Sequence, residues 1–170
     1  DIIYIRHTES EGFLSEGDQS WLIYHELSPR PQDKIFNKNF NSIFKKTDIK
    51  AYLDSKGIKS YTVVGMQAEF CIDTSLKVGF EYGYEQVLVR DAVTTFDNNH
   101  LKAQQIIDFY QDYIWNNRFA KVLDIEDVKK IKIVPITENI VENKDGTNEN
   151  NDKIEFKIEN KNNEENSKIR

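Results

Sequence analysis

Cys71 is the only cysteine of the 170-residue chain and lies where an enzyme commonly presents a nucleophile. An apolar run at residues 61–64 is typical of a strand that is covered on both faces, and Gly65 ends it. From Cys71 onward the apolar residues follow a helical period, so we expect residues 66–70 to cross from strand to helix and Cys71 to lie in the first helical turn. The unpaired N–H groups and positive end of a helix favour a thiolate there. A free cysteine is also commonly a small buried apolar side chain, so this pattern alone leaves both roles open.

A lysine is the second residue type that such chemistry would use. A cation beside a thiol stabilises the thiolate, and it can orient or protonate a leaving group. Lys34, Lys38 and Lys45 lie in or beside the segment DKIFNKNFNSIF at residues 33–44. Most lysines are merely solvated, and composition does not distinguish among these three.

Several segments of the chain resemble the isochorismatase-like cysteine hydrolase family. The longest, VVGMQAEFCIDTSLKVGFEYGYEQVLVRDA at residues 63–92, is similar to the family's core motif of a strand, a turn, a nucleophilic Cys and a helix with a D-x-T/S pattern. IIYIRH at residues 2–7, WLIYHEL at 21–27 and KNFNSIF at 38–44 match further family segments in the same order. The resemblance extends to about residue 128. It implies a hydrolase that cleaves a small amide or a related C–N bond through an acyl-enzyme on Cys71.

The same resemblance implies catalytic roles for three residues. Cys71 corresponds to the nucleophile, and Lys38 to the catalytic lysine, which in the family precedes an aromatic, a Ser and a Phe, as it precedes FNSIF at residues 40–44 here. The backbone N–H groups of Gln67 and Cys71 would bind the negative oxygen of the intermediate, provided that the Met66–Gln67 peptide is cis as in the family.

The third catalytic group of the family is an aspartate at the end of a first strand, and we expect this chain to lack it. That strand and a long helix precede the segment that begins at Ile2, and Asp1 does not take the place of the acid. Their absence would leave two facing strand edges. Two other interpretations therefore stay open. One is an inactive family member or fragment that acts as a binding or assembly module, and the other is vinyl-ether hydrolysis of the isochorismate type. The presence of both Cys71 and Lys38 favours the cysteine hydrolase.

The alternation of strand-like and helix-like segments predicts an α/β fold. We expect a three-layer, Rossmann-like parallel sheet with helices on both faces, without the family's first strand. Apolar runs predict strands at residues 86–89 and 121–125, and a long helix is predicted at 101–120. A shorter helix is predicted at residues 48–57, with Asp48 as its cap and a glycine at its end. The hydrolase domain is expected over residues 1–136. Residues 137–170 are rich in Asn, Glu and Lys and predict a disordered tail.

Composition argues against several other classes of function. The net charge of −6 and the pI of about 5.2, without a basic stripe, argue against nucleic acid as a partner. A lone cysteine forms no internal disulfide, and no apolar run has the length of a membrane span. His7, His25 and His100 lack the spacing of a metal site, so we expect no metal and no other cofactor. We therefore expect a cytoplasmic protein that acts on a small molecule and, in its full-length form, is a homo-oligomer. Aromatic side chains are expected to wall the pocket: Phe13, Trp21 and Phe40.

Overall fold

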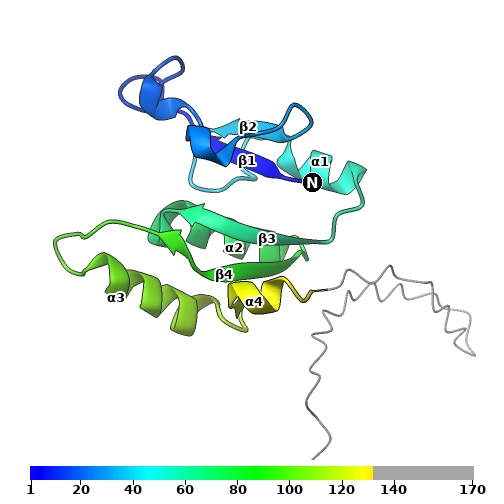
Figure 1. Cartoon of the computed structure of the whole chain (residues 1–170), viewed down its shortest axis with the longest axis vertical. Helices are drawn as coiled ribbons and strands as arrows, with labels where there is room; N and C mark the ends of the chain where they lie inside the picture. Colours follow the sequence, from blue (N-terminus) through cyan, green and yellow to red (C-terminus); the bar gives the residue numbers. More distant parts are fainter. Residues whose placement is uncertain (132–170) are drawn as a thin grey trace, which may run out of the picture.

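The computed structural model describes residues 1–131 of the chain (Figure 1). The predicted tail at residues 137–170 and the end of the predicted domain at residue 136 lie outside the described residues. The strands are β1 (Ile3–His7), β2 (Lys34–Lys38), β3 (Ser60–Met66), β4 (Glu85–Thr94) and β5 (Lys121–Leu123). The α-helices are α1 (Ile49–Ser55), α2 (Asp73–Glu81), α3 (Ala103–Asp108) and α4 (Ile125–Val128). Shorter helical segments are η1 (Gln19–Trp21), η2 (His25–Leu27), η3 (Ala68–Ile72) and η4 (Phe109–Trp115).

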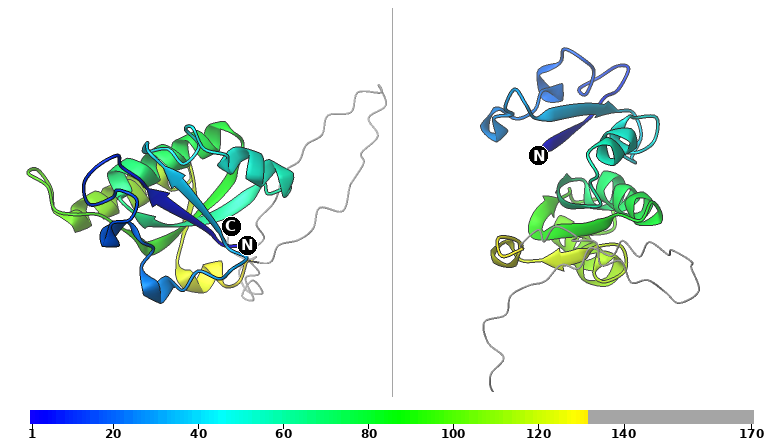
Figure 2. Two further views of the ribbon diagram at one scale, coloured as in Figure 1. Left: turned by 90° about the horizontal axis from the view of Figure 1, so that it is seen from above. Right: turned by 90° about the vertical axis from the view of Figure 1, so that its right-hand side faces the viewer.

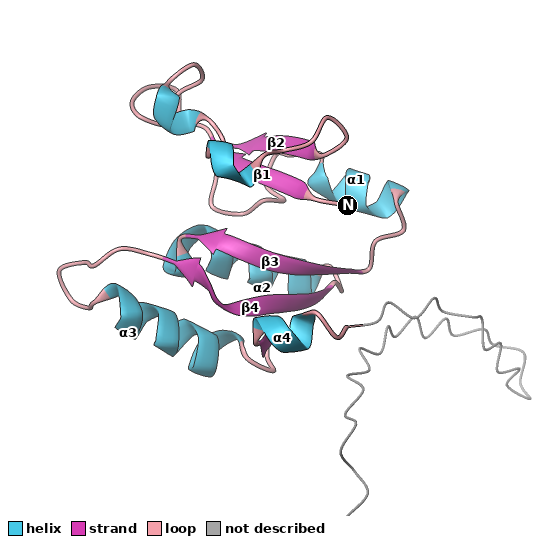
Figure 3. Cartoon of the chain, in the orientation of Figure 1, coloured by secondary structure: helices cyan, strands magenta, loops and turns pink. Residues whose placement is uncertain are grey.

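The described strands all pair in parallel and form two sheets (Figures 1 and 3). β1 pairs with β2 so that His7 lies opposite Lys38 at their carboxyl ends. β3, β4 and β5 form the second sheet, with β4 in the middle. β1 is the strand of the first sheet that faces β3 in Figure 1, and no hydrogen-bonded ladder joins the two sheets within the described part of the chain. The predicted parallel α/β fold is confirmed, and its strands are divided between two sheets.

Helices cover the two faces of the strands unequally. α1 and α2 lie on one face and α4 lies on the other (Figure 2). On β3, Tyr61 and Val63 are half-buried and pack into the cores beside the helices. Val64 and Met66 point the other way and are 58% and 51% exposed. The prediction that this run is covered on both faces is therefore wrong, because the described elements bury only one side of β3.

Two apolar cores lie between the strands and the helices. The first belongs to the second sheet, where Leu76 of α2, Leu88 of β4 and Trp115 of η4 are fully buried. The second core joins the two sheets. Its buried members, packed with side chains from β1, β2 and β3, are Phe44, Ile49, Leu53 and Tyr84. Because burying such a side chain contributes roughly 1.5–3 kcal/mol, this core holds the first sheet against the second without a shared ladder.

Gly79 lets α2 approach the second sheet closely. A Cβ atom at this position would lie 2.3 Å from Tyr61 Oη and 2.5 Å from Gln86 Oε1. The buried Gln86 is held in place, since its Nε2 donates to the carbonyl oxygens of Leu76 and Phe119 at 2.8 and 3.0 Å. Its Oε1 accepts from the Tyr61 hydroxyl at 2.8 Å. This packing also fixes η3, the turn from which α2 continues.

Two helix boundaries differ from those that the sequence predicts. The helix predicted at residues 101–120 is α3 followed by the π-helical η4, and the chain becomes extended at Asn116. Asp48 precedes α1 as predicted for a cap, but its side chain makes no capping hydrogen bond. Neither difference moves the strands that carry the candidate site.

Candidate active site

The second sheet presents Cys71 beyond the carboxyl end of β3. The chain leaves β3 through Gly65 and a Met66–Gln67 peptide that is cis, as the family resemblance implied. Gln67 is the N-cap residue of η3, and η3 continues directly into α2. Helical structure therefore begins at Ala68, three residues before the predicted start. Cys71 is half-buried in this first turn.

The first sheet supplies Lys38, the last residue of β2, whose side chain is directed at the thiol. Lys38 is only 4% exposed. Its Nζ donates to Cys71 Sγ at 3.0 Å and to the carbonyl oxygen of Phe40 at 2.9 Å, and it lies 3.0 Å from His7 Nδ1. A buried ammonium group is costly unless it is hydrogen-bonded, and these three contacts account for its three N–H groups. The structure thus brings together two predicted residues that are 33 positions apart.

Gln67, the third predicted site residue, lies in the same turn. Its carbonyl oxygen accepts hydrogen bonds from the backbone N–H groups of Phe70 and Ile72, each at 3.2 Å. These bonds anchor the start of η3, where Cys71 lies one residue beyond Phe70. The role of the Gln67 and Cys71 N–H groups in binding a negative oxygen stays a prediction.

Asn41 and Ser75 belong to the site, and neither was singled out from the sequence. Asn41 Oδ1 lies 4.0 Å from Cys71 Sγ, at the limit of a weak S–H hydrogen bond. Ser75 Oγ donates to the carbonyl oxygen of Asn41 at 3.4 Å and accepts from the N–H of Ile43 at 3.2 Å. These bonds connect the loop after β2 to α2. They therefore hold the loop that follows Lys38 against the helix that follows Cys71. The available signal was the segment KNFNSIF, which sets Asn41 three residues after Lys38.

His7 is the other group that sequence reasoning missed, having been considered there only as a metal ligand. It ends β1, and its Nε2 lies 4.0 Å from Glu9 Oε1. Burial lowers the pKa of His7 below its ordinary value of 6.5, the charge of Lys38 lowers it further, and the Glu9 carboxylate opposes both. Its pairing with Lys38 could have been suspected only from the register of β1 on β2.

Within residues 1–131, no group of three or more His, Cys, Asp and Glu side chains is placed to hold a metal ion. Over the same residues, no helix has the length and apolar character that crossing a membrane requires.

The three aromatic residues expected to wall a pocket lie in different environments. Trp21 is 8% exposed, its Nε1 donates to Thr8 Oγ1 at 2.9 Å, and the Arg6 guanidinium lies 3.2 Å from its ring centre. Trp21 therefore packs the loop after β1 onto the first sheet. Phe13 is 80% exposed. Phe40 supplies a carbonyl oxygen that accepts from Lys38 Nζ, so it is the one of the three for which a contact with Lys38 is seen.

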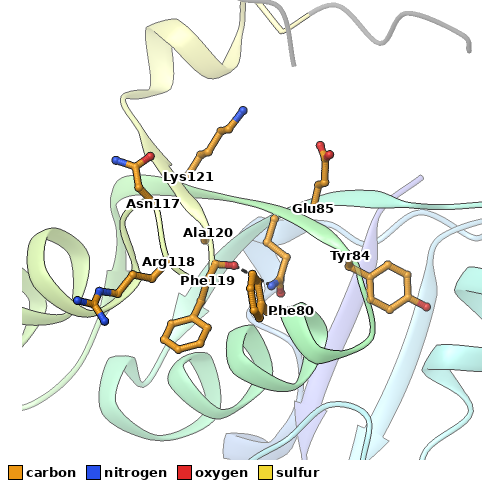
Figure 4. A pocket seen from close by; sticks show the side chains of 9 residues that line it. Phe80, Tyr84, Glu85, Asn117, Arg118, Phe119, Ala120 and Lys121 are labelled. Atoms are coloured by element: carbon orange, nitrogen blue, oxygen red, sulfur yellow. Dashed lines mark hydrogen bonds between the residues drawn. The ribbon is translucent and has the colours of Figure 1, made fainter. Parts of the chain in front are cut away.

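A pocket of about 300 Å³ lies at the opposite end of the strands (Figure 4). It is lined by Phe80, Tyr84, Glu85, Gln86, Asn117, Arg118, Phe119, Ala120 and Lys121. Glu85 and Lys121 are the first residues of β4 and β5, whereas Cys71 follows the carboxyl end of β3. The pocket and the candidate active site are therefore separate.

Known proteins match the chain over the part that carries this site. A family model described as an isochorismatase domain matches residues 1–127. A secreted isochorismatase effector from Verticillium dahliae is 25% identical over 108 residues, which are 62% of this chain and 57% of that protein. A ureidoacrylate amidohydrolase from Agrobacterium fabrum is 26% identical over 102 residues, which are 60% of this chain and 45% of that protein. The chain thus spans about half the length of these curated relatives.

The fold gives an independent match. A crystal structure of an isochorismatase family protein resembles the chain with a TM-score of 0.68 and 31% identity, over 72% of this chain and 72% of that one. The residues that the family model matches include β1 to β5 and both Lys38 and Cys71. Motif, fold and the family model therefore agree, and the chain belongs to the isochorismatase family.

Proposed function

We propose that the protein is a cysteine hydrolase that cleaves a small amide or a related C–N bond through an acyl-enzyme on Cys71. The observation that carries the proposal is the 3.0 Å hydrogen bond from Lys38 Nζ to Cys71 Sγ. A buried ammonium group against a half-buried thiol favours the thiolate, which is the nucleophilic form of cysteine. A lysine with a purely structural role has no need to place its charge on the single cysteine of the chain.

The reaction can be written with the two side chains that meet in the site. The Cys71 thiolate attacks the carbonyl carbon, and the tetrahedral intermediate collapses to a thioester as the C–N bond breaks. The leaving amine takes a proton from the Lys38 ammonium, whose N–H is released from the sulfur when the sulfur is acylated. Water then attacks the thioester and gives its proton to the neutral Lys38 amine. The acid departs, the thiolate is restored, and the net reaction is amide plus water to acid plus amine.

The turn from β3 into η3 carries backbone N–H groups that could stabilise the negative oxygen of the tetrahedral intermediate. We assign this role to the backbone N–H groups of Gln67 and Cys71, because the first N–H groups of a helix lack partners within the helix. Preorganised donors of this kind are worth roughly 100- to 1,000-fold in kcat each. The family resemblance supports the assignment.

The curated relatives support the reaction class in coarse terms. The Agrobacterium fabrum protein is named a ureidoacrylate amidohydrolase. We carry over to this chain only hydrolysis of a C–N bond. We further propose a small organic amide as the substrate and a homo-oligomer as the functional form. The cytoplasmic compartment stays a prediction, and one relative is named a secreted effector.

The test is release of ammonia by the full-length protein from a panel of small primary amides and ureido compounds. Release that is lost in Cys71→Ala, together with a trapped acyl-enzyme seen by mass spectrometry, is the expected result. Hydrolysis of a vinyl ether that survives Cys71→Ala would instead favour chemistry of the isochorismate type. No hydrolysis of any compound by protein with an intact, titratable thiol would refute the proposal and favour a binding module.

A further inference from the structure

His7 is a polar group of the site that the proposed reaction does not use. It lies opposite Lys38 in the pairing of β1 with β2, with Nδ1 3.0 Å from Lys38 Nζ. An ammonium group has no lone pair, so it must be the donor and His7 Nδ1 the acceptor. The ring then carries its proton on Nε2, the atom that lies 4.0 Å from Glu9 Oε1. Lys38 and Glu9 together favour one neutral tautomer of His7.

We propose that His7 is a positioning residue: it accepts a hydrogen bond from Lys38 Nζ and thereby holds the ammonium group against Cys71 Sγ. Two of the three acceptors around Nζ, His7 Nδ1 and the Phe40 carbonyl oxygen, belong to the first sheet and its following loop. With both occupied, the third N–H is directed at the sulfur. A lysine ammonium is a point charge on a flexible stem, so fixed acceptors are needed to confine it.

The same geometry makes the contact depend on pH. A protonated His7 carries N–H groups on both ring nitrogens, so it has no lone pair for Lys38 and places a second positive charge beside it. The charged groups that face the ring are Lys38 on β2 and Glu9 in the loop after β1. Burial and Lys38 hold the pKa of His7 below 6.5, so the ring is neutral at neutral pH. We expect Lys38 to be released from the thiol only as the pH falls below that value.

This inference rests on the proposed function only for its effect on turnover, because thiol reactivity can be measured without a substrate. The experiment compares the rate at which iodoacetamide alkylates Cys71 in the full-length wild-type protein and in three variants, from about pH 5 to about pH 8. His7→Asn keeps an acceptor near the position of Nδ1 but does not titrate. His7→Leu removes the acceptor. Glu9→Gln removes the charge that opposes the lowering of the His7 pKa.

At about pH 7.5 we expect His7→Asn to react within about twofold of wild type and His7→Leu to react at least about threefold more slowly, but no more slowly than a variant that lacks the Lys38 cation itself. As the pH falls, wild type should lose more of its reactivity than His7→Asn does. Glu9→Gln should shift that loss to lower pH.

Equal rates for wild type and His7→Leu would overturn the inference. So would a His7→Asn variant that reacts as slowly as His7→Leu, or one that keeps the acid-side loss of wild type. If thermal melting shows that His7→Leu does not fold, His7→Asn and Glu9→Gln still decide the matter. Absence of amide hydrolysis alongside the expected labelling pattern would refute the proposed function and leave the role of His7 standing.

Discussion

Replacing Lys38 with Met removes the contact on which the proposed mechanism depends. Met keeps most of the length and volume of the side chain, so the main loss is the ammonium group 3.0 Å from Cys71 Sγ. Coulomb's law at this distance gives about 1.4 kcal/mol at a dielectric constant of about 80 and about 5.5 kcal/mol at about 20. Because Lys38 is only 4% exposed, the attraction is stronger than the value at a dielectric constant of about 80. Because Cys71 is only half-buried, the attraction is weaker than the value at about 20.

An attraction of about 1.4 to about 4 kcal/mol corresponds to a factor of roughly 10 to 1,000 in how strongly the ammonium group stabilises negative charge on the sulfur. About half of this factor, on a logarithmic scale, survives in the alkylation rate, because a less basic thiolate is a weaker nucleophile. Lys38→Met should therefore react with iodoacetamide about 3- to 30-fold more slowly than wild type at about pH 7.

Lys45→Met is the matched control for this substitution. It removes the same charge from an exposed lysine whose Nζ lies 4.2 Å from the centre of the Phe40 ring rather than on the sulfur. We expect its alkylation rate to equal that of wild type, and both variants to melt cooperatively. Equal rates for Lys38→Met and Lys45→Met would refute the electrostatic argument. Labelling of Cys71 only in denaturant would show that the thiol is a core residue.

The remaining predictions concern the nucleophile, the packing of α2 and alkaline stability. Cys71→Ala should abolish amine release and change the free energy of unfolding, measured by urea titration, by no more than about 1 kcal/mol, since one half-buried sulfur atom is lost. Gly79→Ala should lower that free energy by about 1–3 kcal/mol, because its Cβ would lie 2.3 Å from Tyr61 Oη, and adding Tyr61→Phe should recover part of the loss. Burial and the Asp54 carboxylate raise the pKa of Tyr84 to about 12 from an ordinary value of 10.0. The folded protein thus binds the proton of the Tyr84 hydroxyl more tightly than the unfolded chain does. The contribution of Tyr84 to the free energy of unfolding is therefore fully present below pH 10.0 and is lost as the pH rises toward 12. Tyr84→Phe should show less of this fall in melting temperature, and an equal fall in both proteins would contradict the assignment.

The parallel fold and the two site residues Cys71 and Lys38 could be predicted because each is accompanied by a recognisable pattern in the neighbouring sequence. Cys71 follows an apolar run and a glycine, and Lys38 precedes FNSIF. No local sequence pattern signals the contact between His7 and Lys38. The two residues are 31 positions apart and meet only because β1 pairs with β2 in the one register that sets them opposite each other. A shift of one residue would direct one of the two side chains to the other face of the sheet.

The wrong prediction for β3 has a different physical origin. Its apolar run shows that the side chains tolerate burial on both faces, but coverage depends on elements elsewhere in the chain. In the described residues, α2 packs beside Tyr61 and Val63, and Val64 remains 58% exposed. Asp48 is a similar case, since a residue type favoured at caps precedes α1 without making the capping bond.

The division of the strands into two sheets makes the contact between Lys38 and Cys71 depend on tertiary structure. Lys38 belongs to one sheet and Cys71 follows a strand of the other, and no ladder between β1 and β3 fixes their spacing in the described chain. Their 3.0 Å contact would be broken by a relative shift of about 1 Å, because a hydrogen bond is lost over such a distance. Any molecule that binds at the edge of β1 or β3 and moves one sheet against the other would alter the reactivity of Cys71 without contacting it. Such a molecule would be an allosteric effector, because it would change the chemistry of Cys71 from a separate site.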